Sequence, residues 1–126
     1  MREDLTVVKE FTFDSAHFLP GYDGPCGTLH GHTYRLRVGF CGEPSQFEDS
    51  MVLDFADIKK LVQPVIDQLD HTCLNTIPEF PYIPTAEKMV GWICKEIINQ
   101  MDSRMKFYLS FVRLWETPTS YAEWRA

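Results

Sequence analysis

The chain has 126 residues, of which 44% are hydrophobic and 24% charged, and its formal net charge is −6. This length is most simply one domain, residues 1–126, with enough apolar side chains to bury a core. The acidic balance argues against a nucleic-acid-binding protein, because no basic stripe is present to displace phosphate counterions. Without a bilayer-spanning apolar run or a signal-peptide pattern at its first residues, the sequence predicts a cytoplasmic protein.

The four cysteines lack the paired spacing of a zinc ribbon or a redox dithiol, and in the cytoplasm they should be reduced. Cys94 stands among apolar residues of an expected helix, so we expect it in the core. Cys41 and Cys73 are expected to be structural as well. Cys26 differs because it lies in a loop beside polar residues.

The first expected element is a strand from Leu5 to Phe18. Because side chains alternate along a strand, Phe11, Phe13 and His17 share its more apolar face. The next ten residues, 19–28, are rich in glycine and proline, which stop both helix and strand. This stretch is expected to be a loop, and loops often carry functional residues.

Residues 30–40 form the clearest strand pattern in the chain, and they place His30 and His32 on one face. An antiparallel hairpin with the first strand would bring His17 beside this pair. Three histidines with an open fourth position are the ligand set of a catalytic zinc. The sequence therefore predicts Zn²⁺ held by these three residues, with Cys26 near the metal without being a ligand. The alternative is that they are ordinary hydrogen-bonded strand histidines.

Two helices are expected in the middle of the chain. Asp54 is a suitable N-cap for the first, whose apolar residues repeat on one helical face until residues 70–71. An irregular, proline-marked segment follows at 75–84. Thr85 can then cap a second helix that ends near Met101.

Two further strands, 106–116 and 121–124, complete the chain. The order strand, strand, helix, helix, strand, strand predicts an α+β fold with a four-stranded antiparallel sheet and two helices on one face. The edges of so small a sheet would remain open. We therefore expect an oligomer in which joined edges close a barrel.

Several motifs occur in the same order as in a known family. They are Phe13-Asp-Ser-Ala-His17, Cys26-Gly-Thr-Leu-His30-Gly-His32-Thr-Tyr34, Leu53-Asp-Phe55, Leu69-Asp-His71, Leu74-Asn75, Pro84-Thr-Ala-Glu87 and Glu116-Thr117. In these motifs the chain resembles the 6-pyruvoyltetrahydropterin synthases and their bacterial relatives, the 6-carboxytetrahydropterin synthases of queuosine biosynthesis. The resemblance implies the tunnelling fold, a zinc held by the three histidines, and a homohexamer of two trimers with active sites between subunits.

The resemblance also implies roles for single residues. Cys26 corresponds to the proton-abstracting base, Asp70 and His71 to a relay for proton transfer, and Glu116 to the carboxylate that binds the pterin ring. These residue types suit those tasks. A thiol becomes a base once deprotonated, an aspartate can fix the tautomer of a histidine, and a carboxylate can accept two hydrogen bonds from an amino-pyrimidine edge.

The motif at residues 84–87 makes Thr85 and Glu87 candidates for substrate binding. Without the family, each of these residues has a plainer interpretation. Thr85 would be a helix cap, Glu87 a first-turn carboxylate and Glu116 a solvated hairpin residue, while the pair at 70–71 would cap a helix end.

The activity that the resemblance implies is that of a zinc-dependent lyase acting on 7,8-dihydroneopterin triphosphate. The amino-acid sequence of residues 27–34 is more similar to the bacterial branch. This similarity favours 6-carboxy-5,6,7,8-tetrahydropterin, acetaldehyde and triphosphate as products. The pyruvoyl product is the alternative. A non-catalytic pterin-binding module would be expected to lack the relay, and a structural zinc module would need a fourth protein ligand. The expected partner is a small molecule, with no nucleic acid and no membrane.

Overall fold

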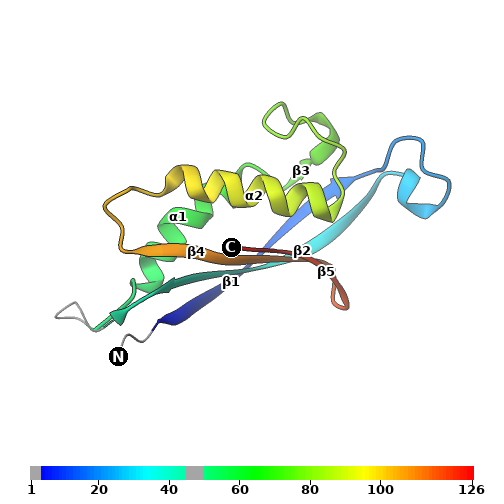
Figure 1. Cartoon of the computed structure of the whole chain (residues 1–126). Helices are drawn as coiled ribbons and strands as arrows, with labels where there is room; N and C mark the ends of the chain where they lie inside the picture. Colours follow the sequence, from blue (N-terminus) through cyan, green and yellow to red (C-terminus); the bar gives the residue numbers. More distant parts are fainter. Residues whose placement is uncertain (1–3, 45–49) are drawn as a thin grey trace.

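The computed structural model describes residues 4–44 and 50–126. Figure 1 shows two helices on one face of a sheet, and a loop between the first two strands that extends beyond the end of the sheet. The strands are β1 (Leu5–His17), β2 (His30–Gly42), β3 (Thr72–Cys73), β4 (Phe107–Thr117) and β5 (Ser120–Arg125). The helices are α1 (Phe55–Asp67) and α2 (Ala86–Gln100), with short 3-10 turns η1 (Pro25–Gly27) and η3 (Leu74–Thr76).

The sheet has five strands in the order β3-β1-β2-β4-β5. The pairs β1–β2, β2–β4 and β4–β5 are antiparallel, whereas β3 runs parallel to β1 with Ser15 opposite Thr72. The expected four-stranded antiparallel sheet is therefore wrong, because a fifth, parallel strand is added at one edge. A strand of two residues has no alternation that a sequence pattern could reveal, whereas the two helices on one face are confirmed.

The β1–β2 hairpin pairs without interruption from Leu5 opposite Gly42 to His17 opposite His30. Its inward face is apolar and continuous, as the alternation predicts. The buried members of this face include Phe11, Phe13, Tyr34, Leu36, Val38 and Phe40. The uninterrupted register fixes the relative positions of residues near the loop end of the hairpin, where the histidines lie.

Both helices begin at the predicted caps. The Asp54 side chain accepts the N–H of Ala56 at 2.8 Å, and the Thr85 hydroxyl accepts the N–H of Lys88 at 3.2 Å. The first helix ends at Asp67, before the expected residues 70–71, because the chain turns there to begin β3. No helix in the described part of the chain is long and apolar enough to cross a membrane.

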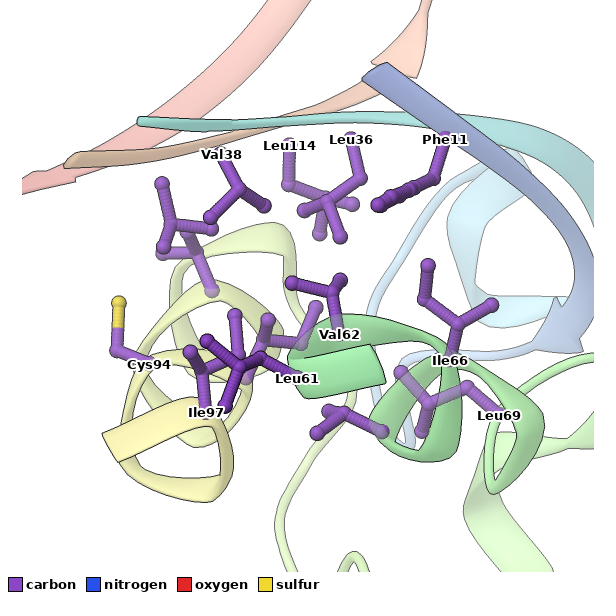
Figure 2. Packing of buried hydrophobic residues seen from close by; sticks show 14 of the residues in the cluster. Phe11, Leu36, Val38, Leu61, Val62, Ile66, Leu69, Cys94, Ile97 and Leu114 are labelled. Carbon is purple, nitrogen blue, oxygen red and sulfur yellow. The ribbon is translucent and has the colours of Figure 1, made fainter. Parts of the chain in front are cut away.

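The core lies between the sheet and the helices. In Figure 2, Phe11, Leu36 and Leu114 point from the sheet toward Val62 of α1. Each fully buried side chain of this size contributes about 1.5–3 kcal/mol relative to exposure. Burial also raises the pKa of the Cys94 thiol to about 12, so it remains protonated. The prediction that Cys94 belongs to the core is confirmed.

Candidate metal centre and active site

Three imidazoles meet at the loop end of the hairpin. His17 is buried and lies directly opposite His30, and their Nε2 atoms are 3.1 Å apart. One ligand nitrogen from each of His17, His30 and His32 lies within 4.8 Å of the other two. The structure therefore brings together the three histidines that the strand patterns placed on one inward face.

The carbonyl partners of two histidines set their tautomers. His17 Nδ1 is 2.8 Å from the Pro84 carbonyl and His30 Nδ1 is 2.6 Å from the Thr28 carbonyl, so each Nδ1 carries the proton and donates it. Each Nε2 then carries a lone pair. Two such nitrogens 3.1 Å apart repel each other unless a cation lies between them. Tetrahedral zinc, with Zn–N bonds of 2.0–2.1 Å, would separate two such nitrogens by about 3.3 Å.

The third histidine also suits a metal. His32 Nε2 is buried and makes no hydrogen bond within the described residues. Burial lowers the pKa of His32; the nearby Glu116 carboxylate opposes this effect, and His17 and His30 add to it. A neutral imidazole with a buried, unpaired nitrogen is the form that binds a metal. The three residues therefore fit a zinc ion.

Glu116 faces this cluster because it lies two residues after the buried Leu114, on the inward face of β4. Trp115 pairs with Tyr121 and Thr117 with Ser120, so Glu116 has no partner across the β4–β5 hairpin. Its Oε1 lies 3.3 Å from His17 Nε2 and 3.7 Å from His32 Nε2. The interpretation of Glu116 as a solvated hairpin residue is therefore wrong.

Tyr34 lies beneath the same cluster and is fully buried. Its hydroxyl is 3.4 Å from His17 Nδ1. Burial raises the pKa of Tyr34, and the charge of Glu116 raises it further. Tyr34 is thus a neutral, buried side chain that packs beneath the histidines, whereas the sequence analysis named it only as the last residue of a motif.

Cys26 is held in the protruding loop by its backbone. Its carbonyl accepts the N–H of Leu19 at 2.8 Å, and it lies in the middle of η1. A Cβ at Gly27 would overlap the carbonyl oxygen of Tyr22, so the loop requires glycine there. The Cys26 thiol is partly exposed and makes no hydrogen bond to another described residue.

Asp70 and His71 form a pair at the β1–β3 edge, where His71 Nδ1 lies 3.0 Å from Asp70 Oδ2. His71 also lines an open hollow, together with His32 and Cys73. In the described part of one chain neither residue hydrogen-bonds Cys26. The structure therefore joins the histidine cluster to Glu116, whereas it shows no hydrogen bond between Cys26 and the Asp70–His71 pair among the described residues.

The two remaining candidates lie at the start of α2. Thr85 uses its hydroxyl to cap the helix, while Glu87 is exposed in the first turn and lines a small hollow with Lys95. Their plainer interpretations as cap and first-turn carboxylate thus describe what the side chains do here. The functional contact of this segment is the Pro84 carbonyl, which a sequence pattern cannot identify because every residue has a carbonyl.

Asn75 is a further residue that the patterns did not assign. Its amide forms two hydrogen bonds of 2.9 Å with the backbone of Phe18, one to the N–H and one to the carbonyl. This contact fixes the chain immediately after His17. The only sequence signal was the Leu74-Asn75 motif, which gave no role to the amide.

Comparison of the whole fold with solved structures identifies its class. The structure of 6-pyruvoyl tetrahydropterin synthase from Caenorhabditis elegans matches with a TM-score of 0.86 and 25% identity, covering 100% of this chain and 99% of that one. This likeness, together with the one-sided sheet, defines a protein of the tunnelling-fold class.

Comparison at the sequence level identifies the family. Residues 6–126 match the family model described as 6-pyruvoyl tetrahydropterin synthase, and the chain belongs to that family. The 6-carboxy-5,6,7,8-tetrahydropterin synthase of Haemophilus influenzae is 38% identical over 141 residues, covering 94% of this chain and 97% of the relative. The dihydroneopterin monophosphate aldolase of Pyrococcus furiosus is 34% identical over 110 residues, covering 87% and 88%.

Proposed function

We propose that this protein is a zinc-dependent lyase that converts 7,8-dihydroneopterin triphosphate to 6-carboxy-5,6,7,8-tetrahydropterin, acetaldehyde and triphosphate. The observation that carries the proposal is the cluster of His17, His30 and His32. Among the described residues the buried His32 Nε2 has no hydrogen-bond partner, and Glu116 lies against the imidazoles. The 38% identity to a protein named for the carboxy product supports this choice of branch.

Glu116 is the residue proposed to bind the pterin ring. An ionised carboxylate can accept two parallel hydrogen bonds from the N–H groups of an amino-pyrimidine edge. The alternation of β4 directs the carboxylate to the face that carries the histidines, so a pterin ring bound to it would place the substrate side chain near the cluster. Zinc bound by the three histidines would supply a Lewis acid for the hydroxyl oxygens of that side chain.

Proton transfer is assigned to Cys26 and to the Asp70–His71 pair. The thiolate of Cys26 removes a proton from the substrate side chain, and His71, oriented by Asp70, exchanges protons with the reacting groups. A carbon–carbon bond of the side chain then breaks in a retro-aldol-like step, and one water molecule completes the carboxylate. Release of triphosphate accompanies this sequence.

Within the described part of one chain, Cys26 makes no hydrogen bond to Asp70 or His71. We therefore infer that these residues meet across a subunit interface. We place the active site between subunits of a homohexamer built as a dimer of trimers. In that arrangement the protruding loop of one subunit supplies Cys26 to the Asp70–His71 pair of its neighbour. Two sheet edges support it: in the described chain β5 pairs only with β4, and β3 covers β1 only at Ser15 and Ala16.

Incubation of the purified protein with 7,8-dihydroneopterin triphosphate, followed by an acetaldehyde assay, tests the proposal. Stoichiometric acetaldehyde and 6-carboxytetrahydropterin are expected. A pyruvoyl product without acetaldehyde would reject the carboxy branch in favour of a 6-pyruvoyltetrahydropterin synthase, the activity named for the C. elegans structure. Tight binding of the substrate without any product would instead indicate a non-catalytic pterin-binding module.

A further inference from the structure

The outer face of the sheet, which is the face opposite α1 and α2, carries a row of charged side chains across four strands (Figure 1). Glu10 of β1 lies opposite Arg37 of β2, and Arg37 lies opposite Arg113 of β4. Glu123 of β5 lies opposite Arg113. Arg37 Nε donates to Glu10 Oε1 at 2.8 Å, and Arg113 Nε donates to Glu123 Oε1 at 2.6 Å. Each arginine of this row is therefore paired with a carboxylate of the same chain.

The neighbouring row, two residues along each strand, has no carboxylate. Arg35 lies between Thr12 on β1 and Trp115 on β4, and Tyr121 lies beyond Trp115 on β5. The guanidinium carbon of Arg35 is 3.8 Å from the centroid of the Trp115 ring, and among the described residues this guanidinium forms no ion pair. Arg35 therefore adds a positive charge that its own row does not balance.

Trp115 is buried although it is not part of the core between the sheet and the helices. Its ring is covered from the outer face instead. The guanidinium carbons of Arg37 and Arg113 lie 5.1 Å and 5.3 Å from its centroid, and the Tyr121 ring lies 5.3 Å away. Cation–π attraction favours each guanidinium at the indole, but the three positive charges repel one another. The fold thus gathers three guanidiniums at one ring in a chain whose formal net charge is −6.

These guanidiniums keep hydrogen-bond donors for a ligand. Each has five N–H donors in a planar fork. Arg37 uses its Nε and one terminal nitrogen on Glu10, and Arg113 uses its Nε on a carboxylate. Stacking on Trp115 fixes the plane of the Arg35 fork and leaves its N–H edge free to bind an anion in two parallel hydrogen bonds. A phosphoryl group is a suitable anion, because its oxygens can accept hydrogen bonds from more than one guanidinium.

We propose that Arg35, stacked on Trp115, is the centre of a binding site for an oxyanion of the phosphate class on the outer face of the sheet. Arg37 and Arg113 flank it and supply further positive charge. The site lies on the opposite face from the histidines, because Trp115 and Glu116 alternate along β4. This inference does not rest on the proposed activity, since the metal centre takes no part in recognising the anion.

The test is isothermal titration calorimetry of the zinc-loaded protein with inorganic pyrophosphate at low ionic strength, where screening is weak. The wild type should bind it, and Arg35→Gln should bind at least about tenfold more weakly, because a charge-assisted fork is lost. Arg35→Lys keeps the charge without the fork and should show a smaller loss. The matched control, Arg104→Gln, removes the same charge from an exposed guanidinium paired with Asp102 and should bind pyrophosphate as the wild type does.

Equal pyrophosphate affinity in the wild type and Arg35→Gln would overturn the inference, because the anion would then be bound elsewhere, such as at the metal. An equal loss in Arg104→Gln would reduce it to an effect of net charge. A smaller particle size of Arg35→Gln in light scattering would also overturn it, because Arg35 would then contact a second copy of the chain. Arg35→Gln should retain zinc and turnover, so failure of the proposed activity leaves this test intact.

Repeating the titration with ADP separates two sources of the same phosphate chemistry. Tighter binding of ADP than of pyrophosphate would identify the phosphoryl groups of a nucleotide as the ligand, with the half-exposed Tyr121 ring beside the site. Weaker binding of ADP would identify a free anion. In both cases the affinity should fall in Arg35→Gln, and an ADP affinity that does not change in this variant would contradict the site.

Discussion

His17 and His30 lie directly opposite each other in the β1–β2 register, with their Nε2 atoms 3.1 Å apart and their Nδ1 atoms donating to two backbone carbonyls. Both facing nitrogens are therefore electron-pair donors, and a cation between them removes their repulsion. The metal content of the purified protein is therefore the property that tests this arrangement of His17 and His30 most directly.

Replacing His32 by alanine should abolish zinc binding and turnover together, because the site then keeps only two protein ligands. Metal analysis of the purified protein measures the first effect, and product formation measures the second. The control is His71→Ala, which removes the one histidine outside the cluster and should retain zinc. A His32→Ala protein that holds zinc as tightly as the wild type would contradict the ligand assignment.

Cys26→Ala should retain the fold and the zinc but lose turnover, because the proposed base is removed without changing a ligand. The exposed position of the loop predicts little change in the melting temperature. The control is Cys41→Ala, which removes a thiol at the far end of β2 and should leave turnover measurable. Undiminished activity in Cys26→Ala would remove Cys26 from the mechanism.

Removal of zinc by chelation should abolish catalysis while the hexamer persists. The core between sheet and helices is built from apolar side chains that do not depend on the metal. Light scattering before and after chelation measures the assembly, and circular dichroism measures the fold. Collapse of the fold on chelation would favour a structural zinc module, and a monomer before chelation would contradict the hexamer.

The zinc-free protein should lose stability as the pH falls below about 6.5. Burial lowers the pKa of His32 from the ordinary value of 6.5, so the unfolded chain binds more protons than the folded chain below that pH. The contribution of His32 to the free energy of unfolding is therefore present above pH 6.5 and is lost below it. Urea unfolding at about pH 7.5 and about pH 5.5 should show a smaller pH effect in His32→Gln than in the wild type. Equal pH effects would contradict this sign.

Asn75→Ala should destabilise the protein by roughly 1–3 kcal/mol, because two backbone groups of Phe18 lose their partners in a partly buried place. Chemical denaturation measures the change. The control is Asn99→Ala on the exposed face of α2, where the change should stay within roughly 0.5 kcal/mol. Similar losses of unfolding free energy in both variants would show that the Asn75–Phe18 contact does not stabilise the protein.

Much of this protein follows from local patterns in its sequence. The two-residue period of a strand is enough to place His30 and His32 on one face, and the same period puts His17 on the inward face of the preceding strand. The caps Asp54 and Thr85 are also local, because a capping side chain bonds to an N–H only two or three residues away. These features need no knowledge of distant contacts.

Other features depended on contacts between distant segments. The Pro84 carbonyl that fixes the His17 tautomer lies 67 residues away in sequence, and a carbonyl leaves no mark on residue type. The strand β3 exists because the chain turns at His71 and reaches β1, and two residues are too few to show a period. Glu116 meets the histidines because β4 pairs with β2 in the register that sets Arg35 opposite Trp115, and pairing between strands is a property of the folded sheet. The sequence thus determined which residues could form the site, and tertiary packing decided which atoms meet there.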